Sequence, residues 1–157
     1  MARAIRPLLQ TVVMRLELTR RGDYAIRAVL ALARHAPEVV GAARLADETG
    51  IPHRFVAGVM TEVVRSGIAV ARLGRSGGYR LGRPAASISV LDVVEAVEGD
   101  VGRRSCVLRN APCGRDGTCD VHGVFMAAQD ALIERLRSAT IADLLGTGAP
   151  DPVAARP

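Results

Sequence analysis

The stretch GAARLADETGIPHRFVAGVMTEVVRSGIAVARLGRSGGYRLGR (residues 41–83) decides the fold class of this chain. Its first half predicts two helices, one over 43–49 and one over 52–66. Gly50 suits the left-handed turn that ends a helix, and Pro52 suits the first turn of the next one. Two helices joined by so few residues indicate a helix-turn-helix.

The second half of the stretch changes from a helical to an alternating pattern. Ile68 and Val70 alternate with small residues, which predicts a strand. Gly74 and Gly78 bracket a tight reversal, after which residues 79–81 return as a second strand. An arginine-bearing hairpin directly after a helix-turn-helix is typical of a winged helix. The alternative is an ordinary hairpin beside a helical bundle.

Helical periodicity continues on both sides of this region. Apolar residues at spacings of three and four predict helices over 18–35, 87–100 and 121–138. Ser89, followed three residues later by Asp92, is a good N-cap for the second of them. The third has no obvious partner of its own length in the chain, so we expect it to pair with its copy in a second subunit. The positions expected to face inward are, helix by helix, Ala25, Ala28, Val29 and Leu32; Phe55, Val59, Val63 and Val64; Val90, Val93, Val94 and Val97; and Val121, Phe125, Ala128, Leu132 and Leu136.

The predicted fold is therefore mainly α with a small β-hairpin wing: a winged helix-turn-helix domain plus a long dimerisation helix. Residues 140–145 are expected to form a short closing turn, and Met14 is expected to be the natural start. The expected division is a disordered extension over 1–13, the winged domain over 14–84, the dimerisation helix and cysteine segment over 85–145, and a disordered tail over 146–157.

The composition fits one folded domain with an appended dimerisation element. Of 157 residues, 49% are hydrophobic but only 3% are aromatic, so the core must consist of Val, Leu, Ile and Ala. No apolar run approaches the roughly 20 residues that span a bilayer. Pro7 and Gln10 interrupt the mildly apolar start, which argues against a signal peptide. We expect a cytoplasmic protein that does not enter a membrane.

The charge points to a polyanionic partner. The formal net charge is +5, and all 21 residues counted as Lys or Arg are Arg, for which a GC-rich genome is a sufficient reason. No nucleotide-binding glycine loop, catalytic-triad spacing or paired-carboxylate motif is present, so no enzyme is predicted. Residues 69–83 carry four arginines and no acid, which favours DNA as the partner: Arg72, Arg75, Arg80 and Arg83.

All three cysteines lie in the segment CVLRNAPCGRDGTC, residues 106–119. An odd number argues against a disulfide framework, and the polar surroundings argue against inert buried thiols. Metal binding remains. Zinc would need four ligands, but zinc modules use tighter pairs, and gaps of six and five residues favour an iron–sulfur cluster. The candidate ligands are Cys106, Cys113, Cys119 and His122.

Taken in order, five motifs resemble the IscR/NsrR-type family of winged-helix iron–sulfur transcriptional regulators over about residues 14–145. The motifs are LTRRGDYAIRA, the helix-turn-helix, GRSGGYRLGRP, ISVLDVVEAVEG and the three-cysteine segment. The resemblance implies a homodimer that binds double-stranded DNA with two winged-helix domains. It also implies an iron–sulfur cluster held by Cys106, Cys113 and Cys119 near the long helix.

The fourth ligand separates the members of that family. In one type it is a His three positions after the last cysteine, which His122 matches. In another it is an Asp in the first helix of the other subunit, which Asp23 matches. The first gap has six residues where those relatives usually have five, which leaves the subtype open. A 4Fe-4S cluster is favoured over a 2Fe-2S cluster, because three cysteines and one non-thiolate ligand give each iron one ligand.

The predicted function is a repressor that senses nitric oxide, redox or iron–sulfur status. His53 and Arg54, early in the recognition helix, are expected to reach base edges. Arg72, Arg75 and Arg80 in the wing are expected to meet phosphates or the minor groove of a pseudo-palindromic operator. The alternatives are a zinc or thiol-switch repressor, an iron–sulfur redox protein without DNA, and a relative that acts by binding another protein.

Overall fold

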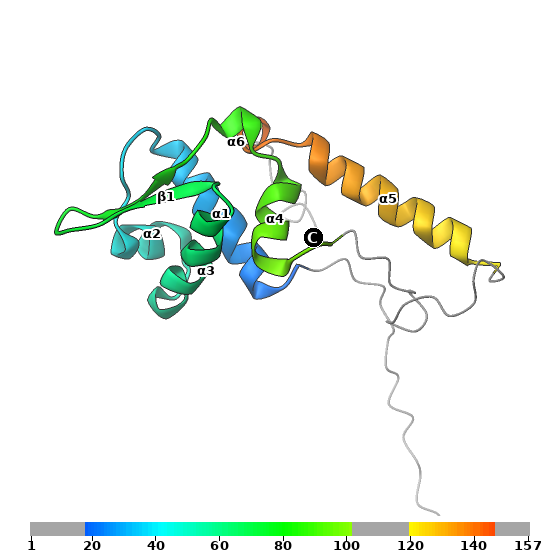
Figure 1. Ribbon diagram of the computed structural model, residues 1–157, viewed down its shortest axis with the longest axis horizontal. Helices are drawn as coiled ribbons and strands as arrows, with labels where there is room; N and C mark the ends of the chain where they lie inside the picture. Colours follow the sequence, from blue (N-terminus) through cyan, green and yellow to red (C-terminus); the bar gives the residue numbers. More distant parts are fainter. Residues whose placement is uncertain (1–17, 102–119, 147–157) are drawn as a thin grey trace, which may run out of the picture.

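The computed structural model describes residues 18–101 and 120–146 (Figure 1). The expected extension with Met14, most of the expected tail, and Cys106, Cys113 and Cys119 lie outside these residues. The described part is mostly helical with one antiparallel hairpin, which confirms the predicted fold class. The elements are α1 (Arg20–Arg34), α2 (Ala42–Thr49), α3 (His53–Arg65), β1 (Ala69–Arg72), β2 (Gly78–Leu81), a 3-10 turn (Ala85–Ser87), α4 (Val90–Glu98), α5 (His122–Ser138) and α6 (Ile141–Gly146).

The helix-turn-helix consists of α2 and α3, as the sequence predicts. Gly50 ends α2 with a left-handed φ of 68°, which a side chain would disfavour. Of the positions predicted to face inward in α3, Val59 and Val63 are buried and Val64 is partly buried, but Phe55 is not in the core. Val56 and Met60 are buried, whereas Phe55 is 40% exposed. Both sets follow a helical period, and packing of α3 against α1 selects the aliphatic one.

The wing is a hairpin that is joined to the rest of the domain by backbone hydrogen bonds. Its register pairs Ala69 with Leu81 and Arg72 with Gly78. Tyr79 also exchanges hydrogen bonds with Val40, with N–O distances of 2.8 and 2.9 Å. A Cβ at Gly78 would overlap the Val40 backbone, so this close approach requires glycine. The attachment fixes the direction in which the hairpin leaves the body.

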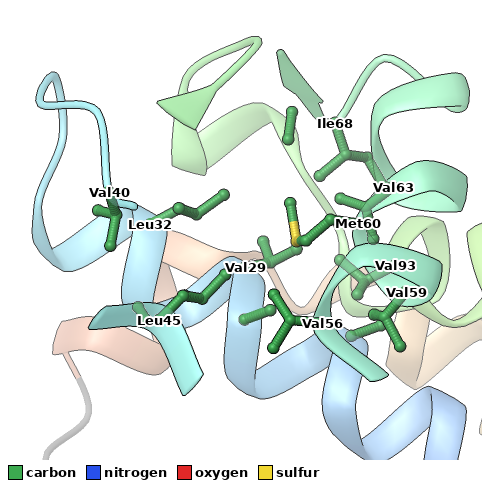
Figure 2. Close-up of a cluster of buried hydrophobic side chains, with 14 of the residues drawn as sticks. Val29, Leu32, Val40, Leu45, Val56, Val59, Met60, Val63, Ile68 and Val93 are labelled. Atoms are coloured by element: carbon green, nitrogen blue, oxygen red, sulfur yellow. The ribbon is translucent and has the colours of Figure 1, made fainter. Parts of the chain in front are cut away.

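One aliphatic core holds the domain together. Figure 2 shows Val29 and Leu32 of α1 among side chains from α2, α3 and α4. The fully buried side chains are all aliphatic or Met, and no polar side chain is buried among the described residues. This confirms the prediction of a core of Val, Leu, Ile and Ala, to which Met60 is added. Val93 and Ile141 belong to the same cluster, so α4 and α6 share the core of the winged domain.

The segment after α5 returns to the domain. The N–H of Ile141 donates to the Ile88 carbonyl at 2.8 Å, and the N–H of Val90 donates to the Ala139 carbonyl at 2.8 Å. The predicted closing turn at 140–145 is a short helix, α6, because burial of Ile141 secures its first turn in the core. No helix in the described ranges is long and apolar enough to cross a membrane.

A capping box starts α4, as predicted. The Ser89 hydroxyl accepts from the Asp92 N–H at 3.0 Å, and the Asp92 carboxylate accepts from the Ser89 N–H at 3.0 Å. Arg83 adds an ion pair to Asp92 at 2.9 Å. Partial burial acts to raise the pKa of Asp92, but the bonds from Ser89 and Arg83 outweigh it and lower this pKa below its ordinary value.

The lowered pKa predicts a pH-dependent contribution to stability. Stabilisation by Asp92 is present above its unfolded pKa of about 3.9 and is lost as the pH falls through the lower folded value. We expect Asp92→Asn to reduce the free energy of unfolding by about 1 kcal/mol at pH 7, and by less near pH 3. Urea unfolding at both pH values measures this, with Asp47→Asn on exposed α2 as the control. An equal loss at both pH values would contradict the charge-dependent part.

Candidate nucleic-acid interface

The first turn of α3 is exposed and contains no acidic residue. His53 and Arg54, the two residues predicted to contact bases, both lie there. The guanidinium carbon of Arg54 is 4.9 Å from the centroid of the Phe55 ring, a distance typical of a cation–π contact. This contact holds the Arg54 side chain against the Phe55 ring. The side chains of His53 and Arg54 form no hydrogen bond or ion pair with another described residue, so their donor groups are available to a ligand.

Phe55 belongs to this surface rather than to the core. Its ring centroid lies 5.9 Å from that of Tyr24 in α1, with the planes at 37°. The two rings line an open hollow of about 370 Å³. Its charged lining residues are Arg20 and Arg21 of α1 together with Arg54 and Glu62 of α3. Sequence reasoning missed this role. The sequence did contain a signal for it: an apolar helical face that starts at Val56 includes Met60 and leaves Phe55 on the exposed side.

The wing presents one arginine-rich face to solvent. In the observed register Val70 pairs with Arg80 and Arg72 with Gly78, so Arg72 and Arg80 share a face with Val70. The opposite face carries Ala69 and Leu81, which are buried against the body. Arg75 lies in the exposed turn at the tip. No acidic residue occurs between Glu62 and Asp92, so nothing in this stretch neutralises the arginines.

Arg83 does not belong to the exposed group. It pairs with Asp92 and donates to the Ser87 carbonyl, which uses its guanidinium inside the domain. The sequence counted it with the wing arginines because it lies only three positions after Arg80. The turn at Ala85–Ser87 and the start of α4 instead place the Ser87 carbonyl and the Asp92 carboxylate within reach of its guanidinium.

Asp23 lies in the first turn of α1 and is paired within its own helix. The Nε of Arg27 donates to its carboxylate at 2.8 Å, and its side chain is 42% exposed. The hydrogen bond from this pair raises the pKa of Arg27. An i,i+4 ion pair of this kind is worth a few tenths of a kcal/mol. The carboxylate is thus accessible and held by a weak interaction that a stronger ligand can replace.

The turn that carries Asp23 also contacts the end of α4, where the chain leaves for the cysteine segment. The Thr19 hydroxyl caps α1 and donates to the Glu98 carboxylate. Gly22 leaves room for this contact: a Cβ there would lie 2.7 Å from the Glu98 Oε1, and the Glu98 side chain would have to shift. Downstream, Gln129 of α5 lies 3.5 Å from the Val101 carbonyl as a hydrogen-bond donor.

His122, the other candidate ligand, is the first residue of α5 and is partly buried. Among the residues that the structure describes, no three His, Cys, Asp or Glu side chains form a group that suits a metal ion. The three predicted cysteine ligands lie outside that part. The donor types agree with an iron–sulfur cluster: thiolates and one histidine or carboxylate. The candidate ligands therefore have the donor atoms that an iron–sulfur cluster needs.

Helix α5 has no buried residue in the single chain. It contacts α4 but otherwise extends away from the winged body (Figure 1). Its predicted apolar stripe is intact as a helical face, with Val121 40% exposed and Phe125, Leu132 and Leu136 partly exposed. A 17-residue helix that leaves such a stripe in water is the kind of surface that a second copy buries.

The geometry is that of a winged-helix protein, and comparison with known families gives its membership. The model of the Rrf2 family, described as iron-dependent transcriptional regulator, matches residues 18–147. The chain belongs to the Rrf2 family. This confirms the resemblance stated from the sequence motifs, since Rrf2 relatives of the chain include NsrR and IscR regulators.

Rrf2 relatives match over most of their length. The HTH-type transcriptional repressor NsrR of Streptomyces coelicolor is 30% identical over 132 residues, which are 83% of this chain and 88% of that protein. The structure of T. potens IscR has a TM-score of 0.66 at 22% identity, covering 91% of this chain and 98% of that one. CymR, the global cysteine regulator of B. subtilis, has a TM-score of 0.70 at 20% identity, covering 86% and 100%. The two structures show the shared fold.

Membership of the Rrf2 family establishes the general function. Its members are transcriptional regulators, and this chain is a DNA-binding regulator with a winged-helix fold. The exposed start of α3 and the acid-free wing face are the described surfaces with the charge that DNA requires.

Proposed function

We propose that this Rrf2-family regulator is a homodimeric repressor that senses nitric oxide, redox or iron–sulfur status through a cluster held by Cys106, Cys113 and Cys119. The observation that carries the DNA-binding part is the exposed, acid-free face formed by the start of α3 and the wing. The sensing part is supported by the three cysteines and by the NsrR and IscR relatives.

In this proposal α3 reads bases and the wing holds the backbone. His53 and Arg54 reach base edges in the major groove, where an arginine pairs with guanine in two hydrogen bonds. Arg72, Arg75 and Arg80 contact phosphates or the minor groove. Pairing of α5 with its copy sets the distance between the two α3 helices, so the operator is a pseudo-palindrome.

The fourth ligand in this proposal is His122 or Asp23 of the partner subunit. A histidine or carboxylate is displaced more easily than a thiolate, so a bound cluster would supply one corner that reacts with nitric oxide or oxidants. Asp23 also connects ligand binding to the fold. It lies in the same turn of α1 that touches Glu98, and a movement of this turn would shift α1 against α3.

The wing contact is tested by salt dependence. We expect Arg75→Ala to weaken binding about fivefold to tenfold for all duplexes and to reduce the slope of log K against log salt by about 1, because one phosphate contact is lost. Arg54→Ala should instead relax preference at one base position, by about 1–3 kcal/mol. Fluorescence anisotropy on duplexes selected from a random pool measures both.

Arg137→Ala is the matched control for these variants. Arg137 is exposed but pairs with Glu134 on α5, away from the wing. Its removal should leave both the affinity and the salt slope unchanged. A base-specific effect of Arg75→Ala, without a change in slope, would show that Arg75 reads sequence and does not hold phosphate.

The sensing part is tested by metal content. Protein purified without oxygen should contain about four iron and four acid-labile sulfide per chain and absorb near 420 nm. About two of each would indicate the smaller cluster. Zinc, or no metal from an anaerobic preparation, would contradict the cluster and leave a winged-helix repressor with a zinc or thiol switch.

A further inference from the structure

The tip of the wing carries an apolar side chain that the domain does not cover. Leu73 is 93% exposed, the highest value among the large apolar side chains in the described ranges, where Val124 follows at 72%. A single exposed leucine is common on protein surfaces. The position of this one is informative, because it stands at the end of the hairpin between Arg72 and Arg75.

The backbone of the tip keeps Leu73 exposed. The β1–β2 ladder ends at Arg72 and Gly78, so Leu73 is the first residue beyond it. Gly74 has a φ of +106°, and its carbonyl accepts from the Gly77 N–H at 2.9 Å. A Cβ at Gly77 would overlap the Arg72 carbonyl, so the turn is closed too tightly to admit a side chain at position 77. An open hollow of about 270 Å³ lies between this tip and the start of α2.

The charges around Leu73 select its partner. Arg72 and Arg75 flank it, and the chain from residue 63 to 91 contains no acid. A protein partner that buried Leu73 would also have to desolvate or neutralise these arginines. The minor groove of DNA satisfies both demands: its negative potential attracts arginine, and its sugars and base steps accept apolar side chains.

We propose that Leu73 is an apolar wedge that enters the minor groove at the point where the wing meets the operator, and that it favours flexible pyrimidine–purine steps there. This inference rests on the DNA-binding function proposed above. The arginines on either side hold the two phosphate backbones, and Leu73 packs against deoxyribose and the edge of a base step between them. Partial unstacking at that step bends the duplex around the wing.

The wedge is tested with the full chain on duplexes selected from a random pool. Leu73→Ala should lower the affinity about tenfold without changing the salt slope, because an apolar contact releases no counterions. It should also reduce the bend measured by energy transfer between dyes at the two duplex ends, and lose the preference for TA or CA steps beneath the wing. Since Leu73 is almost fully exposed, its replacement leaves the core intact.

The control is Leu18→Ala, the same change at a 46% exposed leucine before α1. It should bind and bend DNA like the unchanged chain. If Leu73→Ala also binds and bends like the unchanged chain, the wedge is overturned while the regulator function stands. If the unchanged chain selects no duplex at all, the proposed DNA-binding function fails, and the wedge fails with it.

Discussion

Leu132→Glu is expected to leave the chain monomeric and to weaken binding to a two-half-site operator by about 10²–10⁴-fold. A glutamate in the middle of the α5 stripe would place a charge in the buried contact between the two α5 helices. The free energy needed to desolvate that charge exceeds the free energy that pairing of the helices provides. Each monomer then reads one half-site alone and loses the gain from binding both halves together. Sedimentation velocity gives the oligomeric state, and anisotropy gives the affinity.

Ala127→Glu is the matched control for this change. Ala127 is exposed and lies on the opposite side of α5 from Leu132 by the helical period. The same charge at this position should preserve the dimer. If the Leu132→Glu chain sediments as a dimer with full operator affinity, α5 is not the dimer interface, and another surface must pair the subunits.

Cys113→Ser is expected to remove the cluster, lowering iron and acid-labile sulfide from about four per chain to almost none. A serine hydroxyl keeps its proton at neutral pH and cannot replace a thiolate as a ligand of iron. The measurement is metal and sulfide content on anaerobic protein, with the visible spectrum. Ser105→Ala, a polar change beside the first cysteine, should keep both. Unchanged iron in the Cys113→Ser chain would remove this cysteine from the site.

The fourth ligand is assigned by a comparison of three variants. Asp23→Ala removes a candidate carboxylate but also frees Arg27. Arg27→Ala frees Asp23 without removing it, so it isolates the effect of the broken ion pair. Loss of the cluster in Asp23→Ala but not in Arg27→Ala would assign Asp23, and selective loss in His122→Ala would assign His122. Stable clusters in all three would exclude both residues.

Local signals predicted the elements of this fold well. Gly50 ended α2, and Ser89 with Asp92 capped α4, because each of these residues has a conformation or hydrogen bond that depends only on near neighbours. Composition was sufficient to predict an aliphatic core. The candidate DNA contacts His53 and Arg54 were placed on an exposed turn for the same local reason. The cysteine ligands stay predictions from the sequence.

The sequence could not predict which of two equivalent local patterns the folded chain adopts. Phe55 and Val56 both begin a stripe with helical spacing, and only the packing of α3 on α1 decided which entered the core. Arg83 and Arg80 look alike in the chain, but only Arg83 meets Asp92. The exposure of Leu73 likewise depends on how Gly74 and Gly77 fold the tip.

The sequence by itself determined the order of elements, the aliphatic core, the family and the arginine-rich character of the wing, because these depend on periodicity, composition and motifs along the chain. Only the tertiary structure decided which arginine is held in an ion pair with α4, which aromatic ring lies at the surface, and that α6 returns to the core through Ile141. Those outcomes follow from contacts between residues distant in sequence, whose energies no local pattern contains.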